Sequence, residues 1–149
     1  MGTFSKSFAV NGAFLTGSRP VIDYLRFFSR SYMFSAHLPQ MTIAAVLEGL
    51  KIVREEPELR ETLSDNVKYV VNGLNAMGYK VVSDVAIIPV HIPEHVDIRK
   101  LNRAFHERGI FINSIEYPAV KKSSQRLRIS LSAKHTKEHL DRALKVFKD

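Results

Sequence analysis

The chain has 149 residues, enough for one domain with a sizeable hydrophobic core but few for two large ones. Hydrophobic residues make up 45% and charged residues 25%, an ordinary globular composition without a membrane-length apolar run or a signal-peptide pattern, so we expect a cytoplasmic protein. The absence of cysteine excludes disulfides and thiolate metal sites.

The charge balance is basic, with 22 Lys and Arg against 15 Asp and Glu, a net +7. Such an excess is typical of proteins that bind nucleic acid, acidic membranes or anionic small molecules. The basic residues are scattered from Arg19 to Lys148 without a block of five or six. We therefore favour solubility and phosphate-bearing ligands such as coenzyme A, and predict no nucleic-acid partner. A basic nucleic-acid-binding α+β domain stays as the weakest alternative.

The first third of the chain predicts two short strands and two helices. Residues 3–17 mix apolar residues with glycines, which indicates two buried strands joined by a tight turn, with Lys6 near a strand end. Ser18 and Pro20 are typical of a helix start, and that helix should reach Phe28. Beyond Pro39, apolar residues at helical spacing predict an amphipathic helix.

The remainder predicts a compact α+β unit. Helices are expected over 59–77, 98–105 and 137–147, and strands over 79–83, 86–92, 110–117 and 126–133. Asp97 and Thr136 are the expected helix caps. Pro57 should interrupt the chain between residues 1–57 and residues 58–149. The pattern indicates a small sheet covered on one face by helices.

Lys6 is the first residue that could carry chemistry. It lies within residues 2–8, Gly-Thr-Phe-Ser-Lys-Ser-Phe, among hydroxyls and aromatics. A lysine in a partly apolar pocket can lose its proton near neutral pH and react with an aldehyde or ketone. A lysine near a chain terminus is more often a solvated surface charge, and composition alone favours that simpler interpretation.

Two arginines form the second candidate. Arg126 and Arg128 lie two apart on a predicted strand, so their side chains leave the same face, while Leu127 should enter the core. An arginine fork binds a carboxylate through two parallel hydrogen bonds. A pair of surface arginines is the alternative.

A third pattern, His-x-x-Glu-His, spans His135 to His139 and matches a motif of some zinc peptidases. Because Thr136 is the expected cap, His135 should precede the helix and not share a face with His139. We therefore predict no metal site here.

Four segments taken together resemble one family. They are Gly-Thr-Phe-Ser-Lys-Ser-Phe at 2–8, Asn-Gly-Ala-Phe at 11–14, Tyr-Met-Phe-Ser-Ala-His-Leu-Pro at 32–39, and Arg-Leu-Arg-Ile-Ser at 126–130 with Ala-Lys-His-Thr at 133–136. In this order they resemble the α-oxoamine synthases, pyridoxal-phosphate (PLP) enzymes that include serine palmitoyltransferase, 8-amino-7-oxononanoate synthase and glycine C-acetyltransferase. The resemblance runs from Gly2 to the end of the chain.

The resemblance implies roles for individual residues. Lys6 would be the catalytic lysine bound to PLP, and Thr3 would donate a hydrogen bond to the cofactor phosphate. Ser35 would reach the phosphate of the neighbouring subunit's cofactor, although Ala36 stands where relatives usually carry a hydroxyl. Arg128 would hold the α-carboxylate of the amino-acid substrate.

The resemblance also implies a fold and a reaction. The fold class is α/β, the C-terminal portion of a fold-type I PLP-dependent transferase. Residues 1–57 would be the tail of the large cofactor domain, and residues 58–149 a small α+β domain with an antiparallel sheet covered by helices. The implied reaction condenses an amino acid with an acyl-CoA, usually with decarboxylation, to an amino ketone.

Family chains are longer, and their cofactor lysine lies past the middle. We therefore expect this chain alone to be incomplete and inactive, with a homodimer partner or a separate N-terminal part. A non-catalytic or regulatory subunit of the same fold is the main alternative.

Overall fold

The computed structural model describes residues 1–149, which form two compact units, Met1–Pro57 and Glu58–Asp149. None of the helices combines the length and the apolar character that a membrane span requires.

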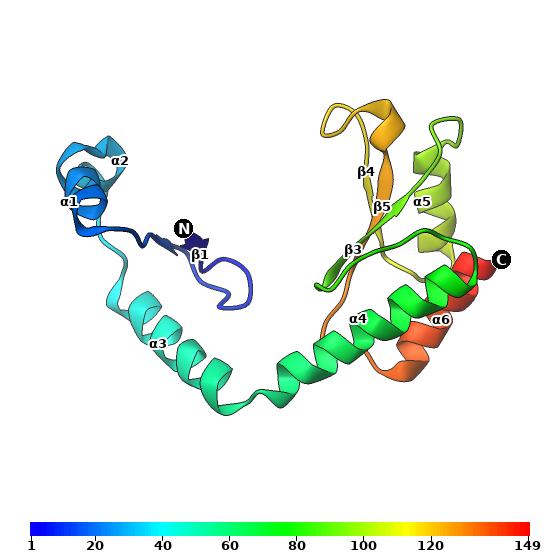
Figure 1. The fold of residues 1–149 in the computed structure, drawn as a ribbon, viewed down its shortest axis with the longest axis horizontal. Coiled ribbons are helices and arrows are strands. Elements are labelled where there is room, and N and C mark those ends of the chain that lie inside the picture. Colours follow the sequence, from blue (N-terminus) through cyan, green and yellow to red (C-terminus); the bar gives the residue numbers. More distant parts are fainter. The chain divides into compact units, whose positions relative to one another are not determined.

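The first unit consists of a hairpin and three helices. Strand β1 (Gly2–Thr3) pairs antiparallel with β2 (Ala13–Phe14), and α1 (Arg19–Phe28), α2 (Arg30–Met33) and α3 (Gln40–Glu55) follow (Figure 1). The two predicted short strands are present, but the expectation that they are buried and joined by a tight turn was wrong. Both strands are largely exposed, and the loop from Phe4 to Gly12 separates them. Helix α2 was not predicted.

Prolines set the limits of the helices in this unit. Pro20 lies in the first turn of α1, and Ser18 occupies the N-cap position without a side-chain hydrogen bond. Helix α3 begins directly after Pro39 and ends before Pro57, because a proline disfavours helical geometry in the residue that precedes it.

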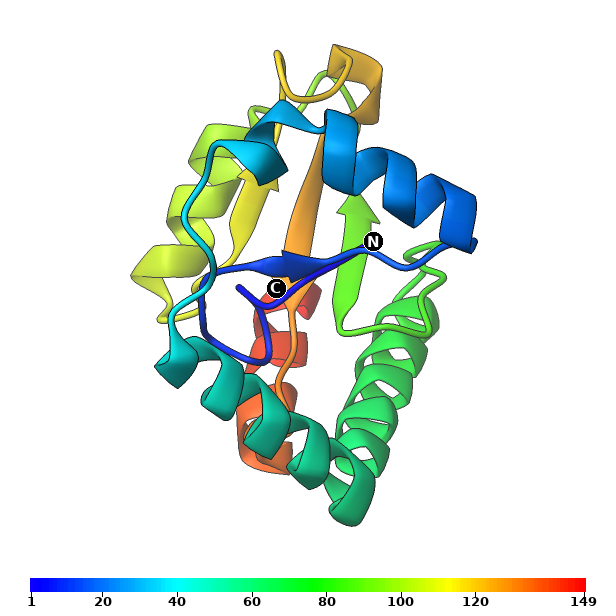
Figure 2. The same cartoon turned by 90° about the vertical axis from the view of Figure 1, so that its left-hand side faces the viewer.

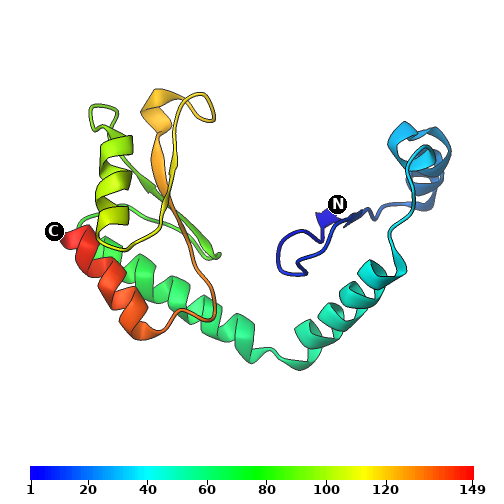
Figure 3. The ribbon, with the colours of Figure 1, turned by 180° about the vertical axis from the view of Figure 1, so that it is seen from behind.

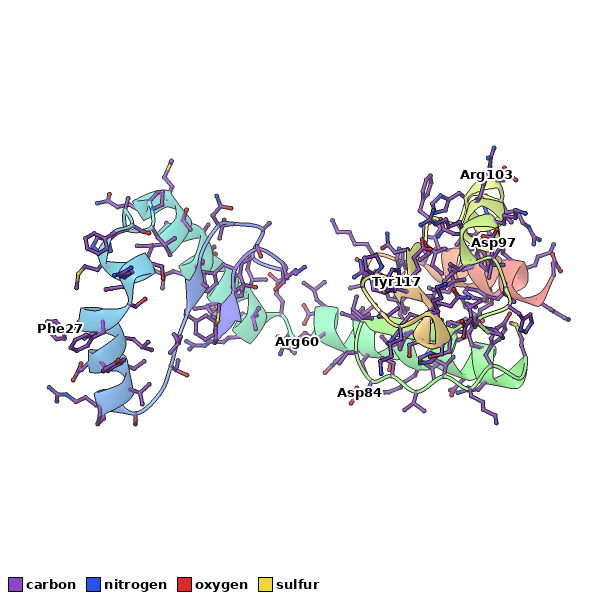
Figure 4. All side chains as sticks on the ribbon, turned by 90° about the horizontal axis from the view of Figure 1, so that it is seen from above. Phe27, Arg60, Asp84, Asp97, Arg103 and Tyr117 are labelled. Atoms are coloured by element: carbon purple, nitrogen blue, oxygen red, sulfur yellow. The ribbon has the colours of Figure 1, made fainter.

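The first unit has almost no core of its own. Val46 is its one buried hydrophobic side chain. Figure 4 shows Phe27 projecting from α1, and its side chain is 69% exposed. Many large apolar side chains of this unit are therefore exposed, which is unusual for a soluble domain. Its large exposed side chains include Phe14, Val21, Tyr24, Phe27, Phe28, Tyr32, Met33, Phe34, Ile43 and Leu47.

The second unit is a three-stranded antiparallel sheet with helices. Its elements are α4 (Glu58–Ala76), β3 (Ile87–His91), α5 (Ile98–Glu107), β4 (Asn113–Ile115), the 3-10 turn Lys122–Ser124, β5 (Arg126–Ser130) and α6 (Lys137–Lys148). The strand order is β3-β5-β4, so β5 is central, as Figure 2 shows.

One face of this sheet forms the core. Ile88, Val90 and Leu127 are at most 1% exposed and pack with side chains of α4, α5 and α6. Burial of each such side chain stabilises the fold by about 2 kcal/mol. Figure 3 shows α4 and α6 side by side, in agreement with their contacts. The predicted antiparallel sheet with helices on one face is thus confirmed.

Residues 79–83 do not form the expected strand. The Asn75 side chain accepts a hydrogen bond from the Val81 N–H and donates one to the Val81 carbonyl, both at 2.9 Å. Val81 still enters the core, whereas Val82 is 92% exposed. The segment that the sequence predicted as a strand is therefore paired with a side chain and not with another strand.

Both predicted caps of the second unit are confirmed. The Asp97 carboxylate accepts hydrogen bonds from the Arg99 and Lys100 N–H groups at the start of α5. Figure 4 labels Asp97 and Arg103 on this helix. The Thr136 hydroxyl accepts from the His139 N–H at the start of α6, and the His139 ring accepts from the Thr136 N–H.

Replacement of Asn75 tests how residues 79–83, which were expected to form a strand, are held in place. Asn75→Ala should lower the free energy of unfolding by roughly 1–3 kcal/mol, because it leaves the buried Val81 backbone groups without partners. Urea unfolding followed by circular dichroism measures the loss. Asn72→Ala, an exposed residue of the same helix, should change stability little, and equal losses in both variants would contradict the assignment.

The α6 cap predicts a pH dependence. Hydrogen bonds from the Thr136 side chain and from the backbone hold the pKa of Glu138 below its usual value. A carboxylate of this kind stabilises the fold above its unfolded pKa, and the contribution disappears as the pH falls through its folded pKa. The difference in melting temperature between the native chain and Glu138→Gln should therefore be largest near neutral pH and shrink as the pH falls below the usual range of a glutamate pKa.

Glu94→Gln provides the control for this measurement, since Glu94 lies in an exposed loop without hydrogen bonds or ion pairs. If both variants show the same dependence on pH, the role of Glu138 is contradicted.

Candidate functional site

Lys6 lies in the loop between β1 and β2, not at a strand end as expected. Backbone hydrogen bonds close this loop, from Phe4 N–H to the Gly12 carbonyl at 2.9 Å and from Val10 N–H to the Phe4 carbonyl at 3.1 Å. The Ala9 N–H donates to the Lys6 carbonyl at 2.9 Å, and Ala9 has a φ of 53°, in the left-handed region. The loop therefore has a defined, locally strained geometry.

Aromatic side chains hold the loop on both sides of Lys6. The Phe4 ring lies 5.6 Å from the Phe8 ring and 5.5 Å from the Phe14 ring, centre to centre. Phe8 packs against α3 so closely that a Cβ at Gly49 would lie 2.6 Å from its ring. Phe4 and Phe8 are half-buried while Lys6 is exposed, so the amine stays accessible on a loop that its neighbours hold in place.

Three residues with hydroxyl groups flank Lys6 in the chain. Thr3, Ser5 and Ser7 are exposed in the same hairpin, and none of their side chains forms a hydrogen bond within the chain. Ser35 is exposed after α2, in a segment tied to the hairpin by Leu38, which packs against Gly12. Thr3 and Lys6 thus share one hairpin and Ser35 belongs to the same unit, but no direct contact joins Ser35 to either. A free amine with hydroxyl donors fits an aldehyde that carries a phosphate.

Arg128 lies on the sheet face of the second unit that its helices leave uncovered. The alternation predicted for β5 is confirmed, with Leu127 buried and Arg128 exposed. The Arg128 Nη2 donates to Asn113 Oδ1 at 3.2 Å. Arg126 is half-buried, and its Nε donates to the Ser124 carbonyl at 3.0 Å. Arg126 therefore fixes a turn, whereas Arg128 presents its guanidinium to solvent.

The two histidines of the His-x-x-Glu-His segment accept hydrogen bonds from backbone N–H groups near the start of α6. His135 Nδ1 accepts from the Ser132 N–H and His139 Nδ1 from the Thr136 N–H, both at 3.2 Å. A neutral imidazole that accepts at Nδ1 carries its proton on Nε2, so neither ring has a nitrogen lone pair free for a metal.

Asn113 is the site residue that sequence reasoning missed. It pairs with Arg128 across β4 and β5, which are distant in sequence. Only the strand register brings the two side chains together, so no local motif marks Asn113.

Comparison with known proteins gives one consistent result. The family model for aminotransferase class I and II matches residues 1–147. The 8-amino-7-oxononanoate synthase of Petrotoga mobilis is 40% identical over 148 residues, covering 99% of this chain and 38% of the relative. The structure of Sphingomonas wittichii serine palmitoyltransferase matches with a TM-score of 0.87 at 31% identity, covering 99% of this chain and 38% of that one. A structure of SPT with a PLP internal aldimine matches with a TM-score of 0.88 at 29% identity over the same shares.

The chain belongs to the aminotransferase class I and II family, and the predicted resemblance to the α-oxoamine synthases is confirmed. The fold class, part of a PLP-dependent transferase ending in a small α+β domain, is confirmed as well. The chain spans 38% of the length of the relatives named above.

The packing of Phe8 on α3 yields a prediction about the Lys6 loop. Gly49→Ala should displace the Phe8 ring and speed hydrogen exchange at the Val10 amide roughly fivefold, equivalent to about 1 kcal/mol of lost packing. Gly17→Ala is the matched control, because its Cβ would meet its neighbours at an ordinary 3.8 Å. Unchanged exchange in Gly49→Ala would show that Phe8 does not hold the loop.

Proposed function

We propose that this chain is the C-terminal part of a PLP-dependent C-acyltransferase that condenses an amino acid with an acyl-CoA to an amino ketone, usually with loss of carbon dioxide. The observation that carries the proposal is the exposed Lys6 amine in a loop held by Phe4 and Phe8 and flanked by free hydroxyls. The names of the relatives, 8-amino-7-oxononanoate synthase and serine palmitoyltransferase, support this class of reaction.

PLP is the cofactor that we propose for this site. Lys6 would bind it covalently, and the hydroxyls of Thr3 and Ser35 would donate hydrogen bonds to its phosphate, which is dianionic and requires such donors. When bound, PLP supplies an electron sink that stabilises negative charge on the α-carbon of an amino acid.

The chain's own residues would orient the substrate and move its proton. The Arg128 guanidinium is exposed and forms no ion pair, so it can take up the α-carboxylate through two parallel hydrogen bonds. Such a clamp restricts rotation of the substrate and fixes the direction of its α-hydrogen. The Lys6 amine, once neutral, is the base that we propose for removal of that proton.

The apolar surface of the first unit is proposed to bind the remainder of a large PLP domain. Exposed aromatic and aliphatic side chains dominate α1, α2 and the outer part of α3. The relatives have a further 62% of their length that this chain does not match, since it covers 38% of each. A second copy in a homodimer is the other proposed partner, with Ser35 reaching the neighbouring cofactor.

Reconstitution tests the proposal. The chain is co-expressed with the part of the Petrotoga mobilis synthase that it does not cover, supplied with PLP, reduced with borohydride and mapped by mass spectrometry. We expect a reduced cofactor adduct on Lys6 and none in Lys6→Ala, because only that amine carries the cofactor.

Lys51→Ala, an exposed lysine of the same unit, is the control and should keep the adduct. Co-purification without any adduct would favour the non-catalytic subunit. An adduct that persists in Lys6→Ala would refute the assignment of Lys6.

A further inference from the structure

We propose that Asn113 is a positioning residue of the amino-acid site: its amide orients the Arg128 guanidinium while leaving the positive charge free for the substrate carboxylate. This inference rests on the proposed role of Arg128 in the function described above.

The two residues are direct neighbours on adjacent strands. Asn113 of β4 pairs with Arg128 of β5 in the antiparallel register, and Arg128 Nη2 lies 3.2 Å from Asn113 Oδ1. A guanidinium can only donate hydrogen bonds, so chemistry requires the amide oxygen to face it. The amide NH₂ group of Asn113 has no partner within the chain and remains available as a further donor beside the guanidinium.

The neutrality of this partner distinguishes Arg128 from three other arginines of the second unit, although Arg126 and Arg142 also donate to neutral acceptors, the backbone carbonyls of Ser124 and Arg108. Arg99 pairs with Glu116 at 2.9 Å, Arg103 pairs with Glu107 at 3.0 Å, and Arg108 pairs with Asp149. Each of those charges is already compensated by a carboxylate.

Arg128 bonds to a side-chain amide, whereas Arg126 and Arg142 bond to backbone carbonyls. A carboxylate in place of the Asn113 amide would compete with an incoming carboxylate for the same hydrogen-bond donors. The amide instead restrains the long side chain and leaves the charge uncompensated.

Burial on the opposite face keeps both backbones in register. Leu127, which precedes Arg128, is fully buried, and Ile112, which precedes Asn113, is 6% exposed. The buried side chains therefore fix the positions of the two strands. The end of the Arg128 side chain is not fixed in this way, and the Asn113 amide is the group that restrains it. A binding group restrained before the ligand arrives loses less conformational entropy on binding.

The test uses the reconstituted protein with PLP and compares Asn113→Asp, Asn113→Ala and Arg128→Gln. The dissociation constant of L-alanine is read from the absorbance change of the bound cofactor, beside that of ethylamine, which is alanine without its carboxylate. Asn113→Asp should weaken alanine binding about tenfold and Asn113→Ala about threefold, while ethylamine binding stays unchanged.

Asn72→Asp, the same change at an exposed position of α4, controls for added negative charge and should leave alanine binding as it is. Equal alanine affinities in Asn113→Asp and Asn72→Asp would overturn the inference. Parallel losses for alanine and ethylamine would also overturn it, because a merely structural defect acts on both ligands. If Arg128→Gln leaves alanine binding unchanged, the proposed role of Arg128 is wrong. This result can be distinguished from a failure of the inference about Asn113, in which Arg128→Gln weakens alanine binding but Asn113→Asp does not.

A second readout needs neither cofactor nor partner. In the ¹⁵N-labelled chain, the Arg128 Nε–Hε signal should shift in Asn113→Ala and stay in place in Asn72→Ala. A signal unaffected by Asn113→Ala would show that the amide does not position the guanidinium.

Discussion

The second unit depends on burial of one face of its central strand. Leu127 is fully buried between β3 and β4, and because side chains alternate along a strand, Arg126 and Arg128 must leave the opposite face. A register slip of one residue would place two guanidinium groups in the core, at a cost no hydrophobic contact could offset. The packing that stabilises the unit therefore also determines where its cationic groups lie.

The first unit positions Lys6, the residue proposed to bind the cofactor, by different means. Few of its side chains are buried, so the Lys6 loop relies on local contacts: aromatic rings on either side, a glycine in α3 that admits one ring, and a left-handed residue that closes the turn. Phe4 and Phe8 are half-buried on either side of the exposed Lys6. The exposed apolar side chains of the unit are the basis of the proposal that it binds further protein.

Features that depend on a few neighbouring residues could be predicted from the sequence. Asp97 and Thr136 cap their helices as expected, since a cap depends on a few neighbouring residues. Residues 79–83 were predicted to form a strand, yet the Asn75 side chain takes the Val81 backbone hydrogen bonds that another strand would have made. Asn113 could not be found in the same way, because its partner is fifteen positions away and only the antiparallel register joins them. The Lys6 motif was recognisable by resemblance, whereas the loop that carries it was not.

The arginines of the chain differ in whether a carboxylate compensates their charge. Exposed ion pairs such as that of Arg99 with Glu116 contribute little to stability, yet they compensate those charges and make them less available to ligands. Arg126 and Arg128 instead bond to a carbonyl and an amide, which orient a guanidinium without neutralising it. An excess of positive charge that is dispersed along the sequence can thus leave individual arginines uncompensated, and the proposed role of Arg128 depends on such a charge. A neutral partner alone does not mark a binding arginine, because Arg142 also donates to a backbone carbonyl, that of Arg108; the proposal for Arg128 depends in addition on the strand register that places Asn113 beside it.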